Sequence, residues 1–342
     1  MGSILGAKDK TKSKKAVTGS GLKIFAYVSM LIDHIGAVLI ERYLDITGYS
    51  AAIRLPEESR PEIANMVILD IMNIVDIVLR IIGRLAFPLF IFLLVQGFMH
   101  TKSKLKYAVR LLVFALIAEI PFDLAHSGNF ISLGYQNVFF TLLLGFLFMC
   151  ISEYIEKKDI DKRLFVPSLI LSVGLTSAYL TRWIMRLFGL GFKGNDLVYD
   201  ALIFSVFMCL CTFGLVFLMK KCSKEAFIKI LAMIGCLLVL MFIATFLKTD
   251  YSGMGVLAIA AAYAMRNDNI ASMTATCIVL TIANLSEAFA FIDLKLIKRY
   301  NGERGLKLKY VFYLIYPVHF LIYYIIALAL GLFGPPSLPK LF

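Results

Sequence analysis

The sequence predicts an all-α protein: a polytopic transmembrane helix bundle of about ten spans, with an amphipathic or re-entrant segment before the second span. Its 342 residues are 60% hydrophobic and 17% charged, with a mean hydropathy of +0.83, which no ordinary soluble domain shows. Apolar stretches long enough to cross a hydrocarbon core of ~30 Å recur along the whole chain. Lysine and arginine gather at the ends of these stretches, as in most multispanning proteins.

The spans follow from stretches with few or no charges. In the first, only Asp33 and His34 interrupt the apolar residues between Lys23 and Glu41, and at ~1.5 Å per residue such a helix roughly spans the core. The remaining stretches are read in the same way, with boundaries good to about three residues. The predicted spans are 22–41, 85–99, 107–124, 137–154, 164–182, 198–219, 227–247, 252–265, 270–291 and 309–333.

We expect a basic cytoplasmic tail at 1–21, the transmembrane bundle at 22–333 and a short tail at 334–342. Lysines precede the first span and no cleavage site follows it, which indicates an uncleaved anchor and a cytoplasmic N-terminus. Loops after the even-numbered spans are basic or mixed, but the strongly basic loop 292–309 follows the ninth. Either one segment is re-entrant, with 85–99 and 252–265 the best candidates, or this loop serves a purpose other than topology.

Charge and motifs exclude several classes of function. The formal net charge of +12 arises at the ends of spans, so it indicates membrane orientation and no nucleic-acid partner. The six cysteines lack the paired spacings of metal sites, and no metal is expected. The absence of Walker, HExxH and GxSxG patterns argues against an ATP-driven pump, a zinc protease and a serine hydrolase. We therefore expect a multi-pass protein of the cell membrane, embedded in the lipid bilayer. The sequence does not predict its oligomeric state.

Asp33 and His34 stand side by side near the middle of the first span, in MLIDHIGAVLI. An ionisable side chain at that depth costs at least a few kcal/mol unless it is paired or solvated, so such residues usually mark a pathway or a site. Neighbouring helical residues point about 100° apart, which makes Asp33 a poor direct partner for His34. We expect Asp33 to pair with an arginine from another helix, and His34 to act as a general base or, alternatively, to bond a carbonyl.

The stretch from 54 to 84 differs from the others because polar residues recur every three or four positions. Asp70, Asn73, Asp76 and Arg80 lie along one stripe of a helix whose other faces are apolar. Such a helix lies in the membrane interface or lines a polar interior. Arg80 and Arg84 share a face, and two guanidinium groups form a good receptor for phosphate or carboxylate. The alternative is ion pairing with Asp33, Asp70 or Asp76.

Four further polar residues stand at the outer ends of the third and fourth spans. Glu119 and Asp123 bracket a proline, and a capping or gating role is as plausible for them as a catalytic one. Gln136 and Asn137 begin the fourth span, where their amides either cap the helix or line a substrate entrance. We expect these residues to line or support the substrate site.

The C-terminal part holds a second intramembrane histidine and a basic loop. His319 lies within an uncharged run and is a candidate partner or second base. In the preceding loop, Lys298, Arg299 and Arg304 stand near two glycines that permit close backbone approach, a pattern suited to gripping a phosphate. A plain positive-inside loop explains the same charges equally well.

Taken together, seven motifs in this order resemble the TraX family: LIDHIGAVLI, LRIIGRLAFPLFIFLLVQGF, AEIPFD, QNVFFTLLLG, DYSGMGVLAI, YNGERG and FYLIYPVHF. The resemblance covers about residues 22 to 325, and DYSGMG is longer than the family's tighter form. It adds Asp250 and Tyr251 to the candidate substrate-lining residues. It also implies a membrane enzyme that transfers an acetyl group from acetyl-CoA to an amine or hydroxyl, because the family is named for a pilin N-acetylase.

In the resulting hypothesis His34 is the catalytic base and Asp33 and His319 are its partners. Basic residues form the binding site for acetyl-CoA. Arg80, Arg84, Lys298, Arg299 and Arg304 would hold the phosphates or the developing oxyanion. The acceptor is a membrane or envelope component, a peptide N-terminus or a glycan. The competing hypothesis is a proton-coupled transporter or flippase of an anionic substrate, in which buried Asp and His relay protons.

Overall fold

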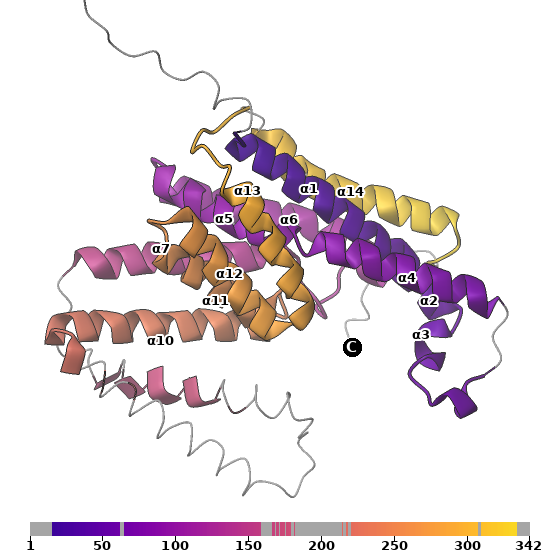
Figure 1. The fold of residues 1–342 in the computed structure, drawn as a ribbon, viewed down its shortest axis with the longest axis horizontal. Coiled ribbons are helices and arrows are strands. Elements are labelled where there is room, and N and C mark those ends of the chain that lie inside the picture. Colours follow the sequence, from indigo (N-terminus) through magenta and orange to yellow (C-terminus); the bar gives the residue numbers. More distant parts are fainter. Residues whose placement is uncertain are drawn as a thin grey trace, which may run out of the picture.

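The computed structural model describes residues 16–61, 65–158, 220–306 and 309–333, with scattered helical residues between 166 and 217. In this part of the chain the regular elements are all helices, and extended pairing is limited to two isolated bridges. The predicted all-α class is therefore confirmed. Figure 1 shows a bundle of long helices lying roughly side by side. Most of the predicted span 198–219 and part of 164–182 fall outside the described residues, as do most of the two predicted tails.

The first helical segment is continuous from Gly19 to Ile46. It consists of α1 (Gly19–Ile35), one turn of π-helix (Gly36–Ile40) and α2 (Glu41–Ile46). The Thr18 hydroxyl caps its start by accepting from the Gly21 amide at 3.3 Å. The π turn follows directly after Asp33 and His34, and such turns occur frequently at functional sites. A short α3 (Tyr49–Ala52) and a 3₁₀ turn (Glu57–Ser59) lead into the next segment.

The predicted amphipathic segment forms α4 (Met66–Gly83), which continues after a break into α5 (Ala86–His100). Together they form one apolar segment of 35 residues, so α4 is the first half of a broken span. The break precedes Pro88, whose missing N–H is tolerated in the first turn of a new helix. The polar stripe of α4 faces α1 to α3, since Asp70 accepts from the Tyr49 hydroxyl at 2.6 Å and Arg80 reaches Asp33.

The rest of the bundle consists of α6 (Lys104–Ser127), α7 (Val138–Lys157), α10 (Lys224–Phe246), α11 (Ser252–Ala264), α12 (Asn269–Ala283), α13 (Leu294–Ile297) and α14 (Lys309–Ala329). Four described helical segments are long and apolar enough to cross a membrane: Gly19–Ile46, Met66–His100, Val138–Lys157 and Lys224–Phe246. Shorter apolar helices lie at Ser252–Ala264, Asn269–Ala283 and Tyr313–Ala329. Helix α14 runs alongside α1 and α6 (Figure 1).

The prediction of one continuous helical span over 270–291 is wrong, because the helix ends at Ala283. Asn284 has an extended backbone and its side chain accepts from the Ser286 amide at 3.1 Å, so it starts a 3₁₀ segment, Leu285–Asp293. This segment and α13 lead the chain back along α12. Asn269 bonds Gln96 on α5, and Tyr300 packs edge-on against Phe92, so both ends of this hairpin lie at the same level of α5.

The tip of the hairpin reaches much deeper, because Glu287 binds Arg84 at the start of α5. Arg84 and Gln96 are about 18 Å apart along the chain at ~1.5 Å per helical residue. The segment 269–300 therefore enters and leaves at one end of the bundle. It thus has the form of a re-entrant segment, one of the two explanations of the basic loop, whereas the candidates expected for that form were 85–99 and 252–265.

This arrangement gathers basic residues at one end of the bundle, which we call the basic end. It carries the start of α1, the loop between α5 and α6, and the loop 298–306. That last loop is bonded to the start of α1: Gly19 donates to the Glu303 carbonyl at 2.8 Å and Ser20 to that of Arg304 at 3.0 Å. Gly305, at a φ of 69°, permits this contact, since a side chain there would overlap Ser20.

Candidate functional site

A cavity of about 550 Å³ lies where α1, the break between α4 and α5, and the tip of the re-entrant hairpin meet. Helices α6, α11 and α14 complete its wall with His126, Ser252 and Tyr316. We call it the histidine cavity, because His34 lines it at about the middle of the first helical segment. Both predicted arginines, Arg80 and Arg84, line the same cavity.

His34 is bonded to His319, the second intramembrane histidine. The distance from Nδ1 of His34 to Nε2 of His319 is 2.7 Å, and the rings lie nearly parallel at 4.9 Å. Nδ1 of His319 is 3.0 Å from the Ile315 carbonyl, which can only accept, so this nitrogen carries the proton. Nε2 of His319 must then accept from Nδ1 of His34. The chain of bonds leaves Nε2 of His34 as an unprotonated nitrogen, which is the form a general base requires.

Asp33 pairs with Arg80 on α4, the kind of partner expected for it. The Nη1 to Oδ2 distance is 2.6 Å, and Arg80 also places its Nε 3.2 Å from Glu41. Nε2 of His34 lies 3.7 Å from Oδ2 of Asp33, beyond hydrogen-bond distance. Asp33 therefore leaves the basic nitrogen uncommitted while standing close enough to stabilise a positive charge on the ring.

Arg84 pairs with Glu287 at the tip of the re-entrant hairpin, at 2.9 Å from Nη1 to Oε1. Glu287 is only 2% exposed, and it was not among the residues predicted from the sequence. Its signal was present, however, because it is the one acidic residue between 270 and 291. Arg80 and Arg84 are thus both paired with carboxylates. Their contacts in this structure are ion pairs, as the alternative to an anion receptor predicted.

Close approach of α1 and α4 depends on glycine. A side chain at Gly83 would overlap the Asp33 carboxylate, and one at Gly36 would approach Asp76 and Arg80. These two positions let Asp33 lie against the backbone of α4 within reach of Arg80. The glycines of DHIG and RIIGR therefore position the ion pair beside His34.

Asp250 and Tyr251, which came from the family resemblance alone, both line the histidine cavity. Asp250 accepts from the Tyr135 hydroxyl at 2.6 Å, and Tyr251 stacks on Phe87 with ring centroids 3.6 Å apart. Tyr251 and Ser252 have positive φ values of 59° and 49°, which cost of order 1–3 kcal/mol each. Such strain is typical of functional sites and here fixes one wall of the cavity.

The other four predicted substrate-lining residues stand behind this wall and are not among those that line it. Asn137 is fully buried; it caps α7 by accepting from the Phe139 amide and also bonds Glu119. Asp123 accepts from the Ser132 amide at 2.7 Å, and Gln136 pairs through its backbone with Asp250 at 2.8 Å. Their observed contacts support the loop that carries Tyr135, and a substrate-lining role for them stays a prediction.

The residues of the predicted phosphate grip are divided between the histidine cavity, which Arg80 and Arg84 line, and the basic end. Arg304 lines a second cavity at the basic end, whereas Lys298 and Arg299 are exposed and line neither of these two cavities. His126, near the end of α6, is partly buried, lines the histidine cavity and bonds the Phe122 carbonyl at 3.0 Å. Within the described ranges, no three His, Cys, Asp or Glu side chains are placed to hold a metal.

The helices and the cavity define a helical membrane protein with an ionisable site enclosed in its bundle. A model of the family described as TraX protein matches residues 18–234 and 163–327, which is most of the chain. The chain therefore belongs to the TraX family. It is also 43% identical over 82 residues to a probable fimbrial assembly protein FimC, serogroup H1, from Dichelobacter nodosus. That match covers 21% of this chain and a third of the relative's length. No solved structure matches.

Proposed function

We propose that this protein is a membrane-embedded acetyltransferase that moves an acetyl group from acetyl-CoA to an amine or hydroxyl of a membrane or envelope acceptor. The observation that carries the proposal is the bonded pair of His34 and His319, which leaves an acceptor nitrogen on a histidine that lines the same cavity as Arg80 and Arg84. Membership of the TraX family and the similarity to a fimbrial assembly protein favour an acceptor in a pilin, namely its peptide N-terminus. A glycan of the envelope is the second acceptor class.

In the proposed reaction, Nε2 of His34 takes the proton of the attacking amine or hydroxyl as that group bonds to the thioester carbon. General-base catalysis of this kind contributes about 10²–10⁴-fold. The carbon–sulfur bond then breaks, and the departing thiolate of CoA recovers the proton from the imidazolium. Asp33, 3.7 Å from this nitrogen, stabilises the imidazolium between the two steps.

The developing oxyanion needs donors on the opposite side of the reacting carbon. Arg84 lines the cavity, and its guanidinium carries five N–H donors, of which the Glu287 ion pair engages those of one nitrogen. We assign the remaining donors to the oxyanion. Arg80 has a different role, because Asp33 and Glu41 engage two of its nitrogens.

We place the basic end on the cytoplasmic side, where acetyl-CoA is made. Lysine and arginine concentrate in the loops of that end, as the positive-inside rule describes for cytoplasmic loops. The N-terminus is then cytoplasmic and the protein is a multi-pass component of the cell membrane. The histidine cavity stands between the two faces, where a cytoplasmic donor and an envelope acceptor can meet.

Mass spectrometry tests the proposal directly. Membranes containing the protein, incubated with acetyl-CoA, should yield an acceptor heavier by about 42 Da, the mass of an acetyl group that replaces a proton. Membranes with His34→Ala should not. A transporter or flippase predicts no such product and instead a proton-dependent flux of an anion into vesicles, so flux without any acetylated product would replace this proposal.

A further inference from the structure

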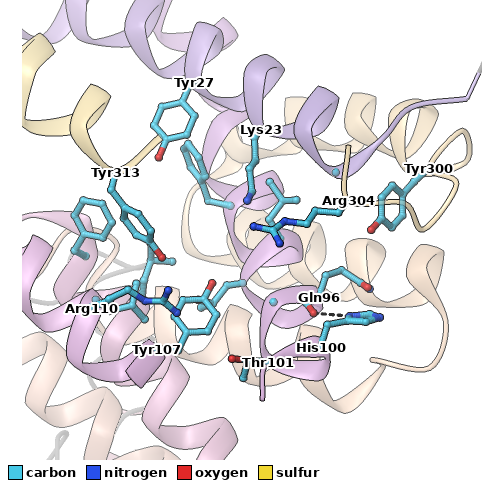
Figure 2. Close-up of a pocket in the computed structure, with 18 of the residues that line it drawn as sticks. Lys23, Tyr27, Gln96, His100, Thr101, Tyr107, Arg110, Tyr300, Arg304 and Tyr313 are labelled. Atoms are coloured by element: carbon cyan, nitrogen blue, oxygen red, sulfur yellow. Dashed lines mark hydrogen bonds between the residues drawn. The ribbon is translucent and has the colours of Figure 1, made fainter. Parts of the chain in front are cut away.

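The second cavity, of about 590 Å³, lies at the basic end. The start of α1, the end of α5, the start of α6 and the loop before α14 surround it, and Figure 2 shows their side chains converging on a common space. We call it the basic cavity. It is separate from the histidine cavity, but Phe90 of α5 lines both.

Among the described residues that line the basic cavity, the charges have one sign. Lys23, Lys102, Arg110 and Arg304 line it, and the described residues of its wall include no Asp or Glu. Figure 2 shows Lys23 and Arg304 directed at the same space from α1 and from the loop. The wall of the histidine cavity differs, because there each arginine meets a carboxylate. A cavity lined by cations without carboxylates is suited to a polyvalent anion.

Two of these cations are held in position by the fold. The backbone of Arg304 is bonded to Ser20, so the loop keeps this side chain near Lys23. Arg110 lies over the Tyr107 ring at 5.3 Å, and its Nε is buried without a hydrogen-bond partner among the described residues. A buried donor without a partner is costly unless a ligand supplies the acceptor.

The spacing between the cavities fits one elongated ligand. Lys23 and His34 are eleven residues apart on one helical segment, which corresponds to about 16 Å. The pantetheine arm of CoA joins the pyrophosphate to the sulfur through about twelve bonds, which span ~14 Å when extended at ~3.5 Å per three bonds. An arm of this length can reach from the basic cavity past Phe90 to the histidine cavity.

We infer that the basic cavity binds the phosphorylated nucleotide of the acyl-CoA donor, with Lys23, Arg110 and Arg304 as its anion-binding residues. The inference rests on the proposed function and moves the phosphate grip away from Arg80 and Arg84, whose charges carboxylates already balance. Tyr27, Tyr107, Tyr300 and Tyr313 complete the wall and offer aromatic faces and hydroxyls to the nucleotide.

The test is the equilibrium binding of CoA to the purified full chain in lipid-free detergent. Arg110→Gln and Arg304→Gln should each raise the Kd about 10- to 150-fold, the range for losing a hydrogen bond to a charged group. Lys106→Gln is the matched control, because this exposed lysine lies one turn from Arg110 on α6 outside the cavity and loses the same unit of charge. Arg304 is in an exposed loop, so its variant tests the site even where Arg110→Gln fails to fold.

A donor without phosphates supplies the second arm. S-acetyl-pantetheine should acetylate the acceptor at the same rate with Arg304→Gln as with the unchanged protein, whereas acetyl-CoA should show a raised KM with little change in kcat. An equal Kd for CoA in both arginine variants and the control would overturn the inference while leaving acetyl transfer intact. Binding of phosphatidylglycerol that Arg110→Gln and Arg304→Gln weaken, with no binding of CoA, would overturn it too and would assign the cavity to a lipid headgroup.

The two proposals fail separately. Charge-dependent CoA binding without any acetylated product would retain the basic cavity as a CoA site and refute the acetyltransferase. If neither Arg110→Gln nor Arg304→Gln changes the rate of acetyl transfer from either donor, the basic cavity is not the CoA site. The acetyltransferase proposal would then stand without it.

Discussion

At the scale of single residues, the account depends on which nitrogen of His34 carries the proton. Two hydrogen bonds in series, from His34 to His319 and from His319 to the Ile315 carbonyl, place that proton on Nδ1. His319 thus does for His34 what a carboxylate does in other catalytic sets, in that it fixes the tautomer and the ring orientation. It is a positioning residue, because His34 is the side chain directed to the reacting atoms.

Replacing His34 by alanine should lower kcat by about 10²–10⁴-fold, the usual contribution of a general base. The KM for acetyl-CoA should change little, since the phosphates bind elsewhere. Steady-state kinetics with purified protein measures both constants. Lys106→Gln is a suitable control, because that lysine is exposed on α6 and lines neither cavity. Unchanged kcat in His34→Ala would exclude the base role.

Two substitutions of His319 separate positioning from packing. His319→Leu removes the acceptor for Nδ1 of His34 and should lower kcat about 10- to 150-fold, the cost of losing a hydrogen bond to a group that becomes charged. His319→Gln keeps an amide oxygen at similar reach and should restore most of that loss. If both variants lose activity equally while their thermal unfolding matches that of the unchanged protein, His319 does not position His34 as described.

At the scale of elements, the re-entrant hairpin formed by α12, the 3₁₀ segment and α13 supplies the carboxylate that pairs with Arg84 in the wall of the histidine cavity. Its entrance at Asn269 and its exit at Tyr300 contact the same part of α5, while its tip carries Glu287 to Arg84. Asn284 produces the reversal, because its extended backbone ends α12 and its side chain caps the next turn.

Cysteine labelling tests this topology. In a chain whose six native cysteines are replaced by serine, Asn267→Cys and Glu303→Cys should react with an impermeant maleimide from the same side as Lys102→Cys. Ser59→Cys, at the opposite end, should react from the other side. All four positions are exposed, so access through the protein does not limit the reaction. A simple span over 270–291 predicts opposite sides for 267 and 303, which would contradict the hairpin.

The ion pair at the hairpin tip should hold the hairpin in place. Arg84→Met leaves a carboxylate that is 2% exposed without its partner, and breaking a buried pair in this way costs about 3–5 kcal/mol. Adding Glu287→Met should recover much of that loss, since removing both charges is often neutral. Thermal unfolding in detergent of the two single variants and the double variant measures the coupling. Additive losses would show that the pair contributes no coupling.

At the scale of the whole molecule, composition and apolar stretches were sufficient for the fold class, and a re-entrant segment was one of the two explanations that the basic loop 292–309 left open. Its location was missed because 270–291 is uniformly apolar apart from Glu287, and hydropathy alone cannot distinguish a span from a hairpin of the same length. The broken span of α4 and α5 was hidden for the related reason that its first half carries a polar stripe.

The sequence predicted which residues belong to the candidate site better than it predicted the contacts between them. Depth in the membrane indicated His34 and His319, but they are 285 residues apart, and only the fold brings them together. Spacing predicted that Arg80 and Arg84 share a helix face, yet could not show that both line one cavity or that each meets a carboxylate. Arg110 was passed over because a basic residue near the end of a span is indistinguishable in sequence from an ordinary topological charge.

The most direct test of the account is a cryo-electron microscopy map of the full chain with CoA bound. We predict phosphate density against Arg110 and Arg304 in the basic cavity, an arm that passes Phe90, and the sulfur within contact distance of Nε2 of His34. Phosphates against Arg80 and Arg84 with the sulfur away from His34, or CoA outside both cavities, would contradict the account.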